Sequence, residues 1–166
     1  TGADTGAAWR VLETFHPPTI YLPPAAFRTG ALRPAPGRSF CEWKGMARYW
    51  TLAGGDRLAE RAGWSYPAPT PGFAALRDHV AVYAGMMDAC LLDEERVAPQ
   101  PGGFYGGWIT AELVGPFKGG PGTLGWQLRG GGDAAILARP VRPMPPPILL
   151  GPGPQRGRDG EVARYL

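Results

Sequence analysis

Residues 40–50 place four chemically distinct groups close together: a thiol, an ammonium, a guanidinium and a phenol, on Cys41, Lys44, Arg48 and Tyr49. A neighbouring cation favours the thiolate form of a cysteine, which is the nucleophile. Side chains alternate along a strand, so an unbroken strand puts Cys41 and Tyr49 on one face and Lys44 on the other. A bulge at Gly45 would bring Lys44 and Tyr49 together but turn Cys41 away. Only one pair can then line a pocket. The simpler alternatives are a buried structural cysteine and a surface lysine.

Aromatic residues further along the chain could form the wall of a ligand site. Trp64 and Tyr66 are followed by rigid prolines, and such rings provide contact area and a polar tip at low entropic cost. The same rings could equally cap the core. Tyr83 and Asp88 flank a predicted loop, residues 84–87. Asp88 has no close acidic neighbour for a paired-carboxylate site, and a turn-capping role is the simpler interpretation.

Several enzyme classes lack their sequence signatures here. Cys41 and Cys90 stand far apart, and His16 and His79 show no ligand spacing, so we predict no metal site. The phosphate-binding patterns G-x-x-x-x-G-K-[ST] and G-x-G-x-x-G are absent. No D-x-D pair is present to hold magnesium for nucleotidyl transfer. We expect no cofactor.

The excess positive charge lies at one end of the chain. Residues 1–138 contain twelve Lys or Arg and twelve Asp or Glu, whereas residues 139–166 contain five Arg and two acidic residues. Binding to nucleic acid requires clustered cations, with aromatic rings beside them for single strands. Arginines scattered among prolines do not favour that function. We interpret residues 139–166 as a Pro/Gly/Arg-rich C-terminal arm.

Cysteine usage and hydropathy indicate the compartment. Two cysteines are too few for a disulfide-dense secreted scaffold, and no window reaches the roughly 18 apolar residues of a membrane span. We expect a cytoplasmic protein without membrane association, and a removed targeting segment would leave no trace in this numbering. The sequence leaves open whether the chain is a monomer or a homodimer.

Composition and periodicity predict a mainly β fold. Glycine and proline account for 46 of 166 residues, yet 11% of the chain is aromatic, which favours a folded, loop-rich domain over residues 1–138. Strands are predicted at 10–15, 20–22, 39–53, 57–64, 80–83, 87–92 and 96–98, with a hairpin at 54–56. Thr70 and Pro71 predict the start of one short helix, Pro71–His79. The glycine-rich segment 101–132 retains aromatic anchors, and we expect it to wrap across the β body.

Several uncommon motifs occur in order. They are Val11-Leu12-Glu13-Thr14 with His16-Pro17-Pro18, Tyr21-Leu22-Pro23, Cys41-x-x-Lys44-Gly45-x-Ala47-x-Tyr49-Trp50, Trp64-Ser65-Tyr66-Pro67-x-Pro69, and Tyr83 with Asp88. Over about residues 9–98 this order resembles the family catalogued as domain of unknown function 427. The stretch from Gly102 to Trp126 looks like the extension of members from photosynthetic organisms.

The resemblance implies a compact β-tent fold of antiparallel strands, similar to B-type methionine sulfoxide reductases and the thalidomide-binding domain of cereblon. It implies no known activity, although a nucleotidyltransferase-like label is sometimes attached to the family. Ala26 stands where the family often has an acidic residue. The paired C-x-x-C ligands of zinc-bearing β-tents are absent.

We therefore predict a domain that binds a small polar or anionic metabolite in an aromatic-lined pocket, with Lys44 or Arg48 as the charge partner. Whether it also catalyses a reaction is left open, and the candidate catalytic residues are Cys41, Lys44 and Asp88. The predicted ligand-binding residues are Tyr21, Lys44, Arg48, Tyr49, Trp64, Tyr66, Tyr83 and Asp88. The alternatives are a thiol-dependent enzyme using Cys41, and a protein–protein adaptor that presents the glycine-rich segment and the arm.

Overall fold

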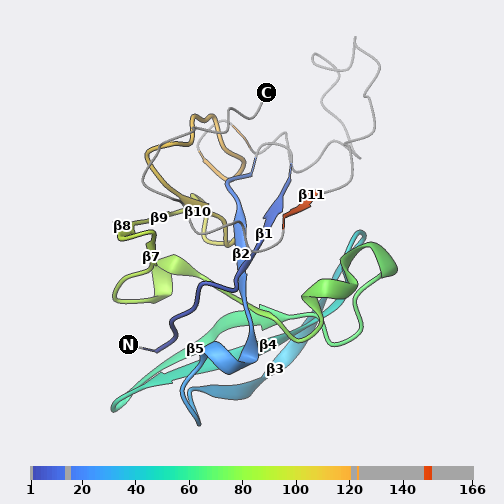
Figure 1. The fold of residues 1–166 in the computed structure, drawn as a ribbon, viewed down its shortest axis with the longest axis vertical. Coiled ribbons are helices and arrows are strands. Elements are labelled where there is room, and N and C mark those ends of the chain that lie inside the picture. The colour runs from blue at the N-terminus through green and yellow to red at the C-terminus, as the bar shows by residue number, and fades with distance from the viewer. Residues whose placement is uncertain (1, 14–15, 121–122, 124–147, 151–166) are drawn as a thin grey trace.

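A computed structural model describes residues 2–13, 16–120 and 123, and the backbone of residues 148–150. Its main feature is an antiparallel sheet of seven strands in the order β11-β1-β2-β6-β5-β4-β3 (Figure 1). The strands are β1 (Trp9–Leu12), β2 (Thr19–Leu22), β3 (Leu32–Cys41), β4 (Gly45–Gly54), β5 (Arg57–Ser65), β6 (Val80–Val82) and β11 (Ile148–Leu150). Two small antiparallel pairs complete the strands: β7 (Leu91–Leu92) with β8 (Glu95–Arg96), and β9 (Ala98–Pro99) with β10 (Trp108–Ile109). The predicted mainly β class is confirmed.

The hairpin between β4 and β5 is confirmed, but the strand predicted over 39–53 is wrong. The chain reverses at residues 42–44, and Cys41 at the end of β3 pairs with Gly45 at the start of β4. Gly45 has a φ of +96°, which glycine adopts without steric cost. Lys44 therefore lies in a turn, so the alternation of side chains along a strand does not determine the direction of its side chain.

Strand β3 was missed because Pro34, Pro36 and Gly37 interrupt its sequence. The strand lies at the edge of the sheet and has a neighbour on one side only. A proline there can turn its missing N–H toward the unpaired side, so no hydrogen bond between strands is lost. Its register with β4 shifts between Ala35 and Arg38. Prediction of a strand from sequence looks for a run of residues without proline or glycine. An edge strand can form without such a run.

The predicted helix Pro71–His79 is wrong in type and length. Three 3₁₀ helices occur in the described part of the chain, η1 (Pro24–Ala26), η2 (Pro71–Leu76) and η3 (Ala84–Met86), and no α-helix is found there. The Thr70 side chain does not cap η2 and instead donates its hydroxyl hydrogen to the Trp43 carbonyl oxygen. Phe73 and Leu76 are buried as the apolar spacing predicted, but the kink at Phe73 breaks the helix into short turns.

The core lies on both faces of the sheet. Tyr21 and Ala81 belong to one cluster of buried side chains, whereas their neighbours Ile20 and Val80 belong to the other. Alternation along β2 and β6 produces this division, because successive side chains point to opposite faces. The two central strands are therefore covered on both sides. No helix within the described ranges is long and apolar enough to cross a membrane.

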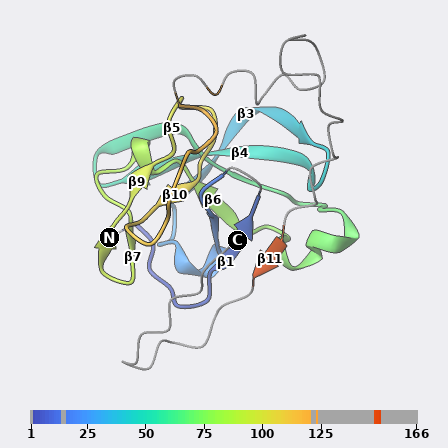
Figure 2. The same cartoon turned by 90° about the horizontal axis from the view of Figure 1, so that it is seen from above.

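Trp108 of β10 packs in the second of these clusters. The Trp108 indole N–H donates to the Val82 carbonyl oxygen over 3.1 Å, and the Trp108 amide donates to the Pro18 carbonyl oxygen over 2.9 Å. Figure 2 shows β10 beside β6. The residues of the predicted segment 101–132 other than 101–120 and Thr123 lie outside the described residues.

Residues 148–150, which the sequence assigns to the arm, form β11. This strand pairs antiparallel with β1, with Arg10 opposite Leu150 and Leu12 opposite Ile148. A strand can pair through its backbone with few buried side chains. The few apolar residues of the arm therefore did not predict a strand. The arm thus contributes one strand to the sheet, and the rest of 139–166 lies outside the described residues.

Candidate functional site

A bulge in β5 sets the position of Arg61. Between the pairs Trp50–Gly63 and Leu52–Ala59, one residue of β4 faces three residues of β5. Arg61 adopts a φ of 52° there, which an arginine rarely adopts. Bulges re-aim side chains, and residues held in sparsely populated backbone conformations gather at functional sites.

The Arg61 guanidinium lies beside residues of β4 and β3. Its carbon is 4.2 Å from the centre of the Tyr49 ring. A Cβ atom on Gly37 of β3 would lie 2.8 Å from a guanidinium nitrogen of Arg61, so the glycine leaves the room for it. Within the described part of the chain, no carboxylate lies within ion-pair distance of Arg61. The cation therefore lies against a ring and has no carboxylate partner among the described residues.

Arg61 lines a groove of about 690 Å³. This volume lies in the range of small-molecule sites, about 300–1,000 Å³. The sheet contributes Tyr49 and Glu60 beside Arg61, and Tyr83 with the three residues of η3 follows β6. Residues 99–105 with Gly107, called here the glycine-rich wall, contribute the rest. Four aromatic rings line the groove: Tyr49, Tyr83, Phe104 and Tyr105. The groove combines a cation with flat apolar surface.

Close backbone packing explains the two glycines at 106 and 107, which follow the aromatic pair of the wall. A Cβ atom on residue 106 would lie 2.1 Å from the Trp64 ring, and one on residue 107 would lie 2.5 Å from the Gln100 side-chain oxygen. Neither position has room for a larger residue. The glycines let the backbone itself cover Trp64 and shape the groove.

A series of aromatic contacts connects the groove with the core. The ring centres of Tyr83 and Trp64 are 4.6 Å apart, those of Trp64 and Tyr21 are 6.2 Å apart, and those of Tyr21 and Tyr66 are 6.4 Å apart. The Trp64 indole N–H donates to the Tyr21 hydroxyl over 3.3 Å. Burial raises the pKa of all three tyrosines above the ordinary value of 10. Tyr21 and Tyr66 are core residues, and only Tyr83 reaches the groove.

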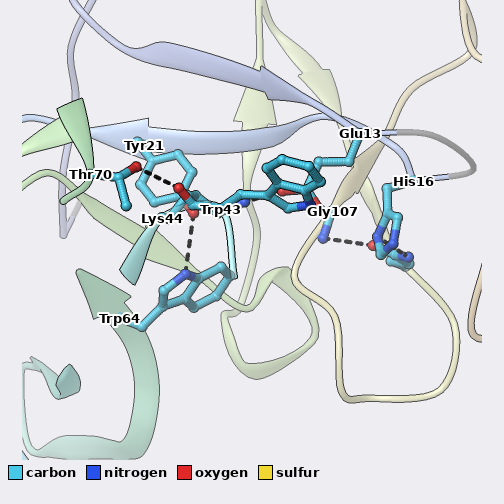
Figure 3. A network of polar contacts seen from close by, with 9 residues as sticks. Glu13, His16, Tyr21, Trp43, Lys44, Trp64, Thr70 and Gly107 are labelled. Atoms are coloured by element: carbon cyan, nitrogen blue, oxygen red, sulfur yellow. Dashed lines mark hydrogen bonds and ion pairs between the residues drawn. The ribbon is translucent and has the colours of Figure 1, made fainter. Parts of the chain in front are cut away.

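Lys44 is buried, with 4% of its surface exposed, and forms an ion pair with Glu13. Its ammonium also lies 5.6 Å from the centre of the Phe73 ring. Figure 3 shows Glu13 and Lys44 between Tyr21 and Trp64 on one side and His16 and Gly107 on the other. The alternative of a surface lysine is therefore wrong. Its charge is neutralised inside the protein by a residue that the sequence analysis did not single out.

The other predicted site residues lie apart from the groove. Arg48 donates to Asp78 over 2.8 Å, stacks on Trp50, and borders a separate hollow of about 290 Å³. Asp88 accepts a hydrogen bond from Arg57, and both side chains are 80% exposed. Cys41 is half-buried and packs against the core that contains Tyr66. Burial raises the pKa of the second cysteine, Cys90, to about 11.

Of the eight predicted ligand-binding residues, the structure brings Tyr49 and Tyr83 into one groove, with Trp64 behind Tyr83. The sequence analysis missed Glu60, Arg61, Gln100, Phe104 and Tyr105, which also line it. The aromatic pair at 104–105 could have been selected from the sequence, because large rings within a glycine-rich segment are expected to pack against another part of the protein. Arg61 had none, since a bulge in the middle of a strand cannot be recognised from one sequence. Among the residues that the structure describes, no three His, Cys, Asp or Glu side chains gather into a metal-binding group.

Comparison with known families gives one result. A family model described as Domain of unknown function (DUF427) matches residues 1–93. This match covers more than half of the chain and includes β1 to β6 with Arg61 and two of the three groove tyrosines, Tyr49 and Tyr83. The glycine-rich wall lies beyond it. A search of curated proteins finds no match to the chain.

Proposed function

The chain belongs to the DUF427 family, and we propose that it binds a small molecule that carries an anionic group next to a flat ring. The observation that carries this proposal is the bulge that holds the Arg61 guanidinium in an aromatic groove without a carboxylate partner among the described residues. A guanidinium binds carboxylates and phosphates through charge-assisted, often bidentate hydrogen bonds. The groove tyrosines and Phe104 would hold the flat part of the ligand.

This proposal changes the charge partner expected from the sequence. Lys44 pairs with Glu13, and Arg48 pairs with Asp78, so a ligand would have to displace a carboxylate from either of them. Arg61 has no such partner in the part of the chain that the structure describes. Phe104, with 72% of its surface exposed, presents a large apolar ring to solvent, which an aromatic ligand would cover.

Two fluorescent probes test the charge and the ring separately. 8-Anilinonaphthalene-1-sulfonate carries an anion and flat rings, and N-phenyl-1-naphthylamine has the same rings without the charge. Arg61→Ala should weaken binding of the sulfonate about tenfold, the low end for a hydrogen bond to a charged group, and leave the neutral probe unchanged. Tyr83→Leu should weaken both probes about three- to tenfold.

Arg57→Ala is the matched control, because this exposed arginine lies outside the groove and pairs with Asp88. Equal sulfonate affinity for Arg61→Ala, Arg57→Ala and the wild type would refute the proposal. Displacement of the bound sulfonate by aromatic carboxylates and aryl phosphates would then rank the anionic group that the groove accepts.

A further inference from the structure

Gln100 holds the glycine-rich wall through its side chain. The residue is 3% exposed and lines the groove. Its side-chain oxygen accepts from the Gly107 amide over 3.1 Å, and its Nε2 donates to the Lys118 carbonyl oxygen over 2.8 Å. The same Nε2 lies 3.1 Å from Nδ1 of His16. One buried amide thus connects two points of the glycine-rich segment with His16, which lies between β1 and β2.

The two backbone partners fix which way the amide faces. Only an oxygen can accept from the Gly107 N–H, and only an NH₂ group can donate to the Lys118 carbonyl. The NH₂ group must then also face His16, so His16 Nδ1 has to be an acceptor. The imidazole is therefore neutral and carries its hydrogen on Nε2.

A proton on Nδ1 of His16 would place one hydrogen-bond donor opposite another, the NH₂ group of Gln100. Gln100 could accept from an imidazolium only by turning its amide over, which would oppose NH₂ to the Gly107 N–H and oxygen to the Lys118 carbonyl. Both backbone hydrogen bonds would be lost, and their buried groups would be left unpaired. Protonation of His16 therefore conflicts with the closed position of the wall.

We propose that His16 and Gln100 form a pH-sensitive latch that holds the glycine-rich wall in place while His16 is neutral and releases it when His16 gains a proton. The latch regulates access to the groove, and in that respect it rests on the proposed function. The release itself is a property of the wall and can be measured without any ligand.

The surroundings of His16 set the pH range. Burial is the main cause that lowers its pKa below the ordinary value of 6.5. The carboxylate of Glu13 opposes this shift, whereas the ammonium groups of Lys118 and Lys44 add to it. A hydrogen bond with Gln100 would also raise the pKa, but only with the amide oxygen turned toward the imidazole, which the Gly107 and Lys118 contacts prevent in the closed wall. The Tyr105 ring, 4.5 Å away between ring centres, contacts the imidazole edge to face and is itself 5.3 Å from the Lys118 ammonium.

The sign follows from this direction. In the unfolded segment His16 takes up its proton near pH 6.5, whereas in the closed structure it does so only at lower pH. The open form therefore binds more protons, and closure is favoured fully above pH 6.5. The free-energy advantage of the closed wall over the open wall falls as the pH drops from 6.5 through the lower pKa that His16 has in the closed state.

Amide hydrogen exchange measures the latch directly. After correction for intrinsic rates, the Gly107 amide and its neighbours should lose protection at least about fivefold between pH 7.5 and pH 5 in the wild type. His16→Asn places a non-titrating acceptor near the position of Nδ1, and its protection should not change with pH. His79→Asn removes the other histidine of the chain and should behave like the wild type.

A second measurement uses only the wild type. Nitrogen chemical shifts of the imidazole at pH 7.5 should identify an unprotonated Nδ1 and a protonated Nε2. The opposite tautomer, or wild-type protection that does not depend on pH, would refute the latch. Equal loss of protection at pH 5 in His16→Asn and the wild type would also refute it.

Binding of the naphthalene sulfonate separates the two proposals. The sulfonate and the Arg61 guanidinium keep their charges between pH 5 and pH 7.5, so weaker binding to the wild type but not to His16→Asn would reflect the wall. We expect a loss of at least about threefold. Release of the wall with unchanged sulfonate affinity would refute its control of the groove. Failure of Arg61→Ala to weaken binding would refute the groove as the site while leaving the exchange result intact.

Discussion

Removal of the Glu13 carboxylate should destabilise the protein more than removal of its partner's charge. The Lys44 side chain is 5% exposed and that of Glu13 is 22% exposed. In Glu13→Gln the ammonium remains buried without a counter-charge, which costs about 3–5 kcal/mol for a fully buried pair. Because water reaches part of Glu13, the lower end applies, about 3 kcal/mol. At about 2–4 °C per kcal/mol, the thermal midpoint should fall by about 6–12 °C.

Lys44→Met should cost less. Methionine retains most of the apolar stem that packs near Phe73, and the carboxylate left behind can draw water through its exposed part. A loss of about 1–2 kcal/mol is expected. The double variant Glu13→Gln/Lys44→Met should be more stable than Glu13→Gln alone, because it no longer buries an unpaired charge.

Calorimetric melting at pH 7.5, where His16 is neutral, measures all three variants without interference from the latch. Arg57→Ala serves as the control, since it removes an exposed ion pair and should shift the midpoint by no more than about 2 °C. A smaller loss for Glu13→Gln than for Lys44→Met, or a double variant no more stable than Glu13→Gln, would show that the pair is hydrated and the reasoning wrong.

Two further predictions concern the segments that join the sheet from beyond the family match. Gly106→Ala would place a methyl group 2.1 Å from the Trp64 ring, so its midpoint should fall by about 2–10 °C, whereas Gly54→Ala, with nothing within 4 Å of the new atom, should change it less. Removal of residues 140–166 should lower the midpoint more than removal of residues 151–166, because only the longer deletion removes β11 from β1. Equal midpoints within either pair in calorimetry would contradict the corresponding packing.

The parts of the fold that could be predicted from sequence are those specified by local pattern. The β4–β5 hairpin follows from Gly54 and Gly55 between two apolar runs, and β6 follows from a short β-branched run. The division of residues 39–53 into two strands depends on Gly45 at positive φ, and a lone glycine within a strand pattern is also compatible with a bulge. The short turns at 71–76 satisfy the same apolar spacing as an α-helix, so periodicity could not distinguish them.

The site was predictable only in part, because its polar contacts join distant segments. Tyr49 and Tyr83 could be selected as rings with exposed tips, and both line the groove. The partners of Lys44 and Arg48, by contrast, lie 31 and 30 residues away along the chain. No local pattern states that a lysine will meet a carboxylate at that distance. The same holds for Gln100, whose side chain contacts His16 across 84 residues.

The prolines of the edge strand limit what can be added to the sheet. Pro34 and Pro36 supply no N–H groups, and the irregularity between Ala35 and Arg38 breaks the regular spacing that an incoming strand would need. Exposed arginines at 33 and 38 add like charges along the same border. A second polypeptide therefore finds no continuous template here for intermolecular strand pairing. A sheet rich in apolar side chains is thereby protected against edge-to-edge aggregation along β3 by the sequence of the strand itself.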